Sequence, residues 1–211
     1  YYTLLHEKRG VRIHTKTRVI GFEGESSVER VICENDVFDA DLVIVGIGII
    51  PNSELAEKAG IACENGITVD ERCQTSIPQI YAAGDCTNHP NPLLNRRLRL
   101  ESVPNAMEQA RVCASNMVGK DKIYSSIPWF WSDQYELKLQ MVGFSSDGDS
   151  EIIRGDMDSN QFSVFHVKEN KVMAADSVNS PKDFMICKQL IGKEVDLDKL
   201  LDESIELKSM L

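Results

Sequence analysis

The segment Tyr81-Ala82-Ala83-Gly84-Asp85 ends an apolar run, and Glu101-Ser102-Val103-Pro104-Asn105-Ala106 begins sixteen residues after Asp85. A strand that stops on Gly-Asp places a carboxylate at the carboxyl edge of a sheet, where the hydroxyls of a cofactor can reach it. Glycine and aspartate also make ordinary turns, so this pair alone is weak support for a ligand site. Its spacing to the second motif favours the ligand interpretation.

The second motif predicts the start of a helix. Ser102 is a good N-cap, Pro104 fits the first turn, and apolar residues follow at helical spacing until Gly119. The amino end of such a helix presents free N–H groups and a partial positive charge. An electron-rich ring that carries a carbonyl group would fit there. The alternative is a structural helix with a conventional cap.

Four motifs in this order resemble the carboxyl-terminal half of the NAD(P)H-dependent ferredoxin and rubredoxin reductases, which are FAD flavoproteins. They are Val45–Asn52, Ile80–Asp85, Glu101–Ala110 and Trp129–Gln134. The resemblance implies that Gly84 and Asp85 bind FAD, with Asp85 on the ribityl chain. It also implies that Ser102 and the Val103 backbone lie near the flavin ring and that Trp131 lies beside the isoalloxazine. Trp129 is at least as well explained as a hydrophobic anchor between domains.

Gly46, Ile47 and Gly48 are expected to bind the nicotinamide cofactor, because two glycines at the end of a buried strand let backbone approach a flat ligand. The apolar run Asp41–Ile47 predicts that strand. Pro51 stands where a Gly-x-Gly-x-x-Gly fingerprint has its third glycine, so this is not a phosphate-binding loop. Glu101 is assigned to the nicotinamide carboxamide by resemblance, or it is a first-turn acid that complements the helix dipole.

The predicted fold is α/β followed by α+β. Residues 1–48 are expected to be the end of an NAD(P)-binding domain, 49–124 the carboxyl-terminal part of an FAD-binding domain, and 125–211 a smaller α+β domain. Neither dinucleotide-binding fingerprint of the family is present in this sequence. The chain therefore resembles a fragment without the amino-terminal half, and an inert fragment that does not hold FAD is one alternative.

Composition limits the partners. A net charge of −10 argues against nucleic acid, and no apolar run is long enough to cross a membrane. Arg96, Arg97 and Arg99 form the one tight basic cluster, which is either a solvated loop or a docking site for an acidic electron carrier. Six cysteines without Cys-x-x-Cys or His-flanked spacing predict no metal site. A cytoplasmic location is expected, and a homodimer is left open.

The resemblance implies electron transfer from NAD(P)H through FAD to a small iron–sulfur protein of the ferredoxin or rubredoxin type, with no catalytic side chain. Alternatives are a monodehydroascorbate reductase, a nitrite reductase flavin subunit, or a flavoprotein like apoptosis-inducing factor. His89-Pro90 resembles the His-Pro of disulfide reductases, but a histidine in a loop over 88–95 is the better interpretation. The choice between NADH and NADPH cannot be read from these residues.

Overall fold

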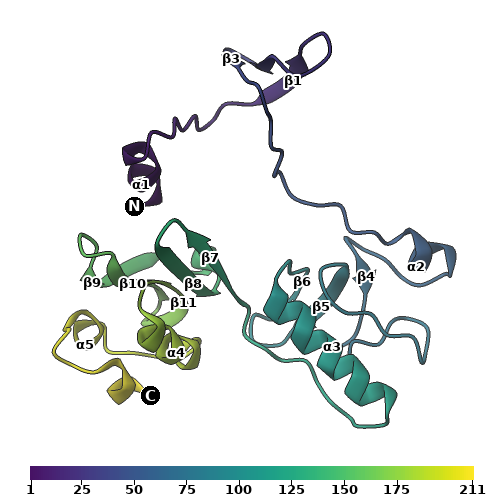
Figure 1. Cartoon of the computed structure of the whole chain (residues 1–211). Helices are drawn as coiled ribbons and strands as arrows, with labels where there is room; N and C mark the ends of the chain where they lie inside the picture. Colours follow the sequence, from purple (N-terminus) through teal and green to yellow (C-terminus); the bar gives the residue numbers. More distant parts are fainter. The chain divides into compact units, whose positions relative to one another are not determined.

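A small antiparallel sheet is the main element of the N-terminal unit, Tyr1–Ile50, in this computed structural model, which describes residues 1–211 (Figure 1). The sheet has the order β1-β2-β3. Its elements are α1 (Tyr2–Lys8), β1 (Val19–Glu23), β2 (Arg30–Cys33) and β3 (Val37–Asp39). Gly10, at a φ of +87°, ends α1, because there its N–H reaches Glu7 O at 3.0 Å.

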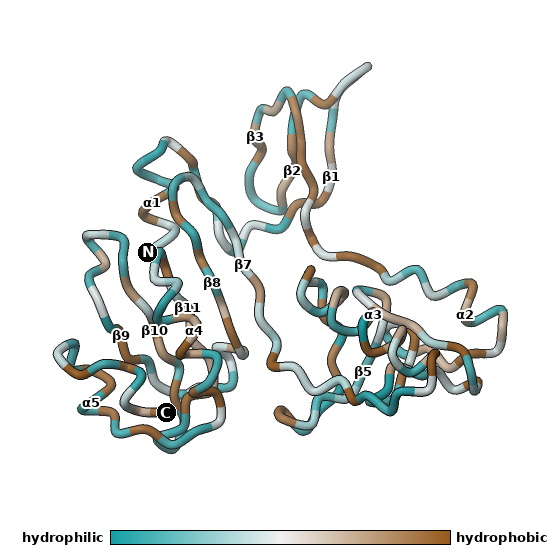
Figure 2. Tube along the Cα trace, turned by 60° about the horizontal axis from the view of Figure 1, so that its bottom comes forward, coloured by the Kyte–Doolittle hydropathy of each residue, from teal (hydrophilic) through white to brown (hydrophobic).

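The predicted strand over Asp41–Ile47 does not form. This run has no regular secondary structure and is largely exposed, with Ile44 at 87% and Ile47 at 91%. Figure 2 shows the hydropathy of the residues along the backbone. A strand buried on both faces needs hydrogen-bonded neighbours and covering layers, and no strand pairs with this run. The prediction was therefore wrong for this structure, although the apolar character that suggested it is present.

The second unit, Pro51–Leu211, begins with a small mixed sheet and a long helix. The elements are α2 (Glu54–Lys58), β4 (Ile67–Thr68), β5 (Thr87–Asn91), β6 (Arg96–Leu98) and α3 (Val103–Met117). Strand β4 pairs parallel with β5, and β5 pairs antiparallel with β6. Helix α3 starts where the sequence predicted.

Two predictions in this region were wrong. Residues 80–83 are not a strand: Tyr81 makes only an isolated bridge to Gln74. The segment over 88–95, expected to be a loop, instead contributes to the β5–β6 hairpin. Buried and half-buried residues alternate along β5, but the buried ones are polar. The strand therefore lacks the alternation of hydrophobic and polar residues from which a strand is predicted.

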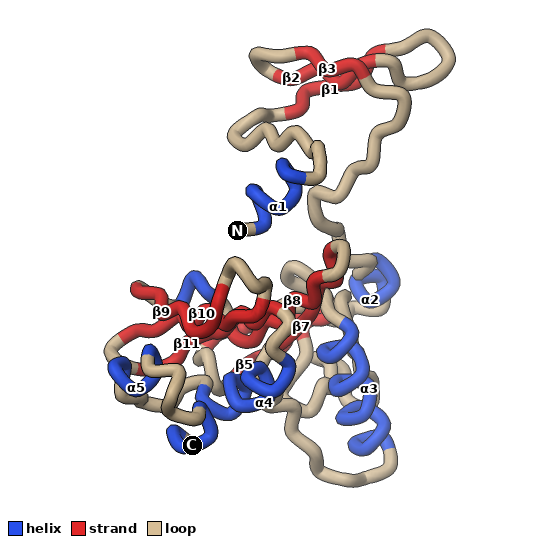
Figure 3. The backbone as a smooth tube through the Cα atoms, turned by 60° about the vertical axis from the view of Figure 1, so that its left-hand side comes forward, coloured by secondary structure: helices blue, strands red, loops and turns tan.

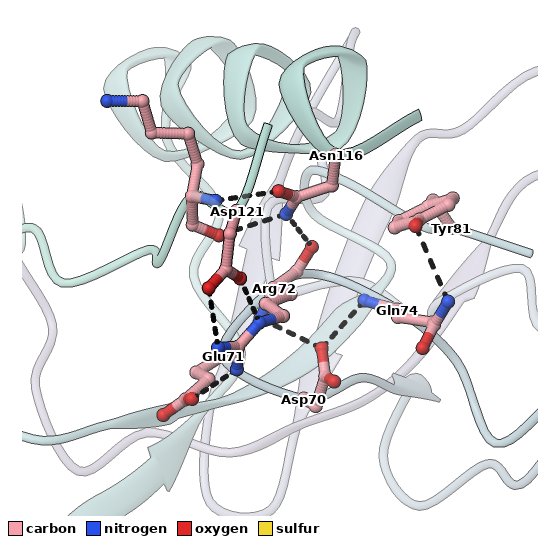
Figure 4. Close-up of polar contacts among 8 residues, drawn as sticks. Asp70, Glu71, Arg72, Gln74, Tyr81, Asn116 and Asp121 are labelled. Carbon is pink, nitrogen blue, oxygen red and sulfur yellow. Dashed lines mark hydrogen bonds and ion pairs between the residues drawn. The ribbon is translucent and has the colours of Figure 1, made fainter. Parts of the chain in front are cut away.

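A network of hydrogen bonds and ion pairs links the turn at Arg72 to the end of α3 and to the segment that follows it (Figure 4). The Asn116 side chain, near the end of α3, donates to the carbonyls of Arg72 and Lys122, each at 2.9 Å. The Arg72 guanidinium donates to Asp121 Oδ1 at 2.6 Å, and the Tyr124 N–H donates to Glu71 O at 2.8 Å. The turn that contains Arg72 and the segment after α3 are thereby held together, with Tyr124 buried beside Cys73 and Cys113.

The carboxyl-terminal part is a five-stranded antiparallel sheet with helices packed on it (Figure 3). Its order is β7-β8-β11-β10-β9. The strands are β7 (Trp129–Gln134), β8 (Leu137–Gly143), β9 (Ser150–Asp156), β10 (Gln161–Lys168) and β11 (Lys171–Val178), and the helices are α4 (Pro181–Leu190) and α5 (Leu197–Leu201), with 3₁₀ turns η1 (Ser145–Asp147) and η2 (Leu207–Met210). Helix α4 contacts β8 and β11.

The core of this part lies between the sheet and α4. Phe165, Val172 and Ala175 of the sheet meet Phe184 and Leu190 of α4 there. Helix α4 begins at Ser180-Pro181, with the proline in its first turn, and α5 is a short helix capped by Asp196. The mixed α/β and α+β architecture agrees with the predicted fold class, while the boundaries 48/49 and 124/125 remain predictions. None of the helices combines the length and apolar character needed to cross a bilayer.

Candidate functional site

The Gly84–Asp85 turn is fixed from inside the molecule. Gly84 is buried at a φ of +88°, its N–H donates to Gln109 Oε1 at 2.7 Å, and its carbonyl accepts from Thr87 Oγ1 at 2.8 Å. Only glycine adopts this left-handed backbone freely. The Asp85 side chain is exposed. Hydrogen bonds therefore hold Gly84 in the interior, while the neighbouring Asp85 lies at the surface.

The start of α3 leaves one amide available. Ser102 caps the helix by accepting from Asn105 N at 3.3 Å, and its carbonyl accepts from Ala106 N at 3.0 Å. Pro104 has no N–H to satisfy. The Val103 N–H has no hydrogen bond within the protein, and Val103 is 56% exposed. This amide and the positive end of the helix dipole are free to bind an electron-rich group.

The structure brings the turn and the helix start together. A Cβ added at Gly84 would lie 3.5 Å from Ala106 Cβ, in the first turns of α3. Arg99 connects the two motifs, because it donates to Asp85 O at 3.3 Å and to Glu101 Oε1 at 2.8 Å. The convergence expected from the sequence spacing is present in the fold.

A shallow pocket lies beside the helix start, with a volume of about 180 Å³. Its lining residues come from both ends of the segment that contains α3: Arg99, Leu100, Glu101, Ser102, Pro128, Trp129 and Phe130. Pockets that enclose a small-molecule ligand measure roughly 300–1,000 Å³. The pocket is therefore smaller than one that encloses a small-molecule ligand, and Trp129 and Phe130 contribute aromatic side chains to its lining.

Trp131 lies next to this pocket but does not line it. Its ring centroid is 5.7 Å from that of Trp129, and Trp131 is 41% exposed on strand β7. The Trp129 indole packs on Phe184, and its Nε1 is buried without a partner. Trp129 thus packs on the core of the carboxyl-terminal part, and its role as an anchor between domains stays a prediction. The role of Trp131 at a flavin stays a prediction.

Gly46, Ile47 and Gly48 belong to the exposed run of the N-terminal unit. A Cβ added at Gly46 or Gly48 would meet no atom within 4 Å, and Gly48 has a φ of +101°. Open space around both glycines is compatible with close approach of a ligand, but no strand positions them here. Their assignment to the nicotinamide cofactor remains a prediction.

The three arginines each bind other parts of the protein. Arg96 makes two 2.9 Å hydrogen bonds to the Asp147 carboxylate and lies 5.0 Å from the Phe144 ring centroid. Arg97 donates to Val69 O at 2.8 Å and to Asn88 Oδ1 at 2.9 Å. Through these contacts the arginines stabilise the β5–β6 hairpin against the neighbouring segments. Docking of a partner on it stays a prediction.

A set of buried polar residues lies behind the site, and the sequence did not predict their burial. They are Thr87, His89, Asn105, Gln109 and Tyr124. His89 is buried in β5 with both ring nitrogens unpartnered, so the interpretation as a loop histidine was wrong. Burial lowers the pKa of His89 to about 4, with a smaller contribution from Arg97. The available signal was the i, i+4 spacing of Asn105 and Gln109 on one face of α3.

Two protein-family models match this chain. Residues 1–110 match the pyridine nucleotide-disulphide oxidoreductase family, and residues 129–211 match the reductase C-terminal family. Putidaredoxin reductase CamA from Pseudomonas putida is 46% identical over 217 residues, which cover 100% of this chain and 51% of that protein.

Two solved structures are similar over almost the whole chain. The ferredoxin reductase for the CYP199A2 system from Rhodopseudomonas palustris gives a TM-score of 0.93 at 36% identity, covering 99% of this chain and 53% of that chain. The covalent putidaredoxin reductase–putidaredoxin complex gives 0.90 at 45% identity, covering 99% and 52%.

The chain belongs to the pyridine nucleotide-disulphide oxidoreductase family. It spans about half the length of the curated relatives it matches. Several of these relatives are named as ferredoxin reductases, which agrees with the resemblance found in the four sequence motifs. The similarity extends through the carboxyl-terminal sheet as well as the Gly84–Asp85 and α3 motifs.

Proposed function

We propose that the complete protein containing this chain is an FAD-dependent reductase that passes electrons from NAD(P)H to a small iron–sulfur protein of the ferredoxin or rubredoxin type. The convergence of the Gly84–Asp85 turn on the free amino end of α3 carries this proposal. Relatives named as ferredoxin–NAD reductases support the choice of donor and acceptor.

The residues present fit a flavin. The exposed Asp85 carboxylate can accept hydrogen bonds from the ribityl hydroxyls, and the unpartnered Val103 N–H can donate to a ring carbonyl. Gly84 allows the turn, and Ser102 fixes the start of the helix. When bound, FAD supplies the redox chemistry, accepting two electrons from the nicotinamide and releasing them singly. The protein holds and orients the ring and stabilises negative charge through the dipole of α3.

The remaining assignments follow from the same proposal. Trp131 covers part of the ring, Glu101 contacts the nicotinamide carboxamide, and Gly46–Gly48 lets the nicotinamide approach the backbone. The pairing of Glu101 with Arg99 supports its role by fixing the carboxylate beside the pocket. The partner docks near Arg96, Arg97 and Arg99; the first of these is 42% exposed at its side chain.

The wider organisation is also part of the proposal. We assign 1–48 to a nicotinamide-binding domain, 49–124 to an FAD-binding domain and 125–211 to the carboxyl-terminal domain. Two separate buried clusters, one around Cys73 and Tyr124 and one around Phe165, support the second boundary. The six free thiols support a reducing, cytoplasmic location. A homodimer through the exposed edges of the carboxyl-terminal sheet completes the proposal.

Replacement of Asp85 tests the proposed function. In the complete protein, Asp85→Ala should weaken FAD binding by at least about tenfold, because a charged hydrogen-bond acceptor is lost. FAD affinity is measured by fluorescence quenching, and flavin occupancy by absorbance after gel filtration. Asp158→Ala is the matched control, since it removes an exposed carboxylate from the β9–β10 turn. Unchanged affinity in Asp85→Ala would contradict the assignment.

A further inference from the structure

Helix α3 turns two polar side chains, Asn105 and Gln109, into the protein interior. Both are buried, and their i, i+4 spacing places them one above the other on the same face. Buried polar side chains are costly unless their hydrogen bonds are made. The contacts of these two residues therefore show what holds α3 in place.

Gln109 is attached to the turn that precedes Asp85. Its Oε1 accepts from the Gly84 N–H at 2.7 Å and from Thr87 Oγ1 at 2.8 Å, and the side chain is fully buried. Thr87 Oγ1 also lies 2.8 Å from the Gly84 carbonyl oxygen, so its single hydroxyl proton is shared between Gln109 Oε1 and Gly84 O. The Gln109 Oε1 atom thus contacts the turn at both of its ends, Gly84 and Thr87. The Gln109 Nε2 has no partner, so the oxygen alone provides this attachment.

Asn105 attaches the same helix one turn earlier. Its Oδ1 accepts from the Tyr124 hydroxyl at 2.9 Å, and its Nδ2 donates to Leu100 O at 3.0 Å. These bonds tie the start of α3 to the segments before and after it. Gln109 is the residue of α3 whose side chain binds the Gly84–Asp85 turn, and Arg99 adds a second link between Asp85 O and Glu101.

We propose that Gln109 is a positioning residue of the FAD site, which sets the distance between the Asp85 carboxylate and the Val103 N–H. This inference rests on the proposed function. A ligand that binds both groups requires a fixed spacing between them, and preorganised groups bind more tightly because less order is lost on binding. Gln109 provides this spacing without touching the cofactor.

The critical variant in the complete protein is Gln109→Met, which keeps the volume and removes the acceptor. It should weaken FAD binding by about tenfold and alter the absorption spectrum of the flavin that remains bound. Gln109→Glu keeps an acceptor oxygen in the same place and should recover most of the affinity. Burial favours the neutral form of the introduced carboxyl group, so it can bind as the amide does.

Thr87→Val is a milder variant that removes one of the two hydrogen bonds with little change in shape. It should give a smaller loss of affinity than Gln109→Met. In the Gln109→Met background it should cause a smaller loss than it does alone, because only the contact of Thr87 with the Gly84 carbonyl then remains to be removed. If Gln109→Met does not fold, Thr87→Val alone tests the role: a loss of FAD affinity supports it, and unchanged affinity contradicts it.

Ser163→Ala is the matched control for stability. It removes a buried 2.8 Å hydrogen bond between Ser163 and Ser177 in the carboxyl-terminal sheet. It should lower the Tm of the apoprotein while leaving FAD affinity unchanged. If Gln109→Met binds FAD as tightly as the unmodified protein, or if Ser163→Ala weakens binding equally, the positioning role is wrong. If the unmodified protein binds no FAD, the proposed function itself fails.

Discussion

His166 Nε2 lies 2.9 Å from Asp176 Oδ2, across strands β10 and β11 of the carboxyl-terminal sheet. The His166 Nδ1 is 3.5 Å from Glu151 Oε1 on β9, so two carboxylates flank a nearly buried imidazole. The hydrogen bond to Asp176 raises the pKa of His166 above its usual 6.5, against the opposing effect of burial. The native protein therefore holds a proton there more tightly than the unfolded chain does.

This pair should make the stability of the sheet depend on pH. Since the native pKa is the higher one, the contribution is complete below the unfolded pKa of about 6.5 and is lost as pH rises through the native pKa. His166→Gln should lower the free energy of unfolding by about 2 kcal/mol at low pH, where a charged hydrogen bond is removed, and by less at high pH. Urea unfolding of both proteins across this range measures the difference.

The control for this prediction is Glu151→Gln, which removes the more distant carboxylate. It should reduce the pH dependence less than His166→Gln does. A difference between His166→Gln and the unmodified protein that stays constant from pH 5 to pH 9 would show that protonation of His166 contributes nothing.

Gly84→Ala should destabilise the protein through backbone conformation. At a φ of +88°, an alanine costs roughly 1–2 kcal/mol relative to glycine. The added methyl group would lie 3.5 Å from Ala106 Cβ, which is an ordinary contact. The loss of stability, measured by urea unfolding, should therefore persist when Ala106→Gly is added. Recovery of stability in the double variant would instead identify a steric clash as the cause.

Helix α3 was predictable because its signals are local. Ser102 accepts the hydrogen bond expected of an N-cap, and Pro104 occupies the first turn. The β10–β11 hairpin was predictable for a similar reason: Glu169 and Asn170 form its turn with φ values of +50° and +60°. In both cases a few adjacent residues determine the backbone conformation.

Strands proved harder because each needs a partner from elsewhere in the chain. Asp41–Ile47 has the composition of a buried strand but no neighbouring strand, and it remains extended and exposed. Conversely, β5 was missed because it buries Thr87, His89 and Asn91, none of which gives a hydrophobic pattern. Composition therefore predicted a strand where the structure has none, and a loop where the structure has β5.

The candidate site was predictable in part. The spacing between Gly84–Asp85 and Ser102–Val103 indicated a shared location, and the fold brings the motifs into contact. For the supporting residue Gln109 the sequence offers only its i, i+4 spacing from Asn105, since a glutamine in a helix is usually exposed and its partners are 25 and 22 residues away. Partners of Arg96 and Arg97 were equally hidden, because they depend on tertiary packing.

Arg154 should be sensitive to substitution, because its side chain binds four backbone carbonyls. Its buried guanidinium donates to the carbonyls of Leu200 at 3.0 Å and Asp202 at 2.8 Å, and also to those of Glu203 and Ile205. One side chain on β9 thus holds the end of α5 and the segment after it. The guanidinium suits this task because it is planar and has five donors.

Arg154→Lys should lower the free energy of unfolding by at least about 2 kcal/mol, since an ammonium group cannot reach all four carbonyls and leaves some unsatisfied. Chemical denaturation measures the loss, and faster amide exchange over 200–205 should accompany it. The matched control is Arg18→Lys, whose guanidinium makes an exposed ion pair with Glu34 and should tolerate the change. Equal stability of the two variants would mean that the carbonyl contacts of Arg154 do not hold this segment in place.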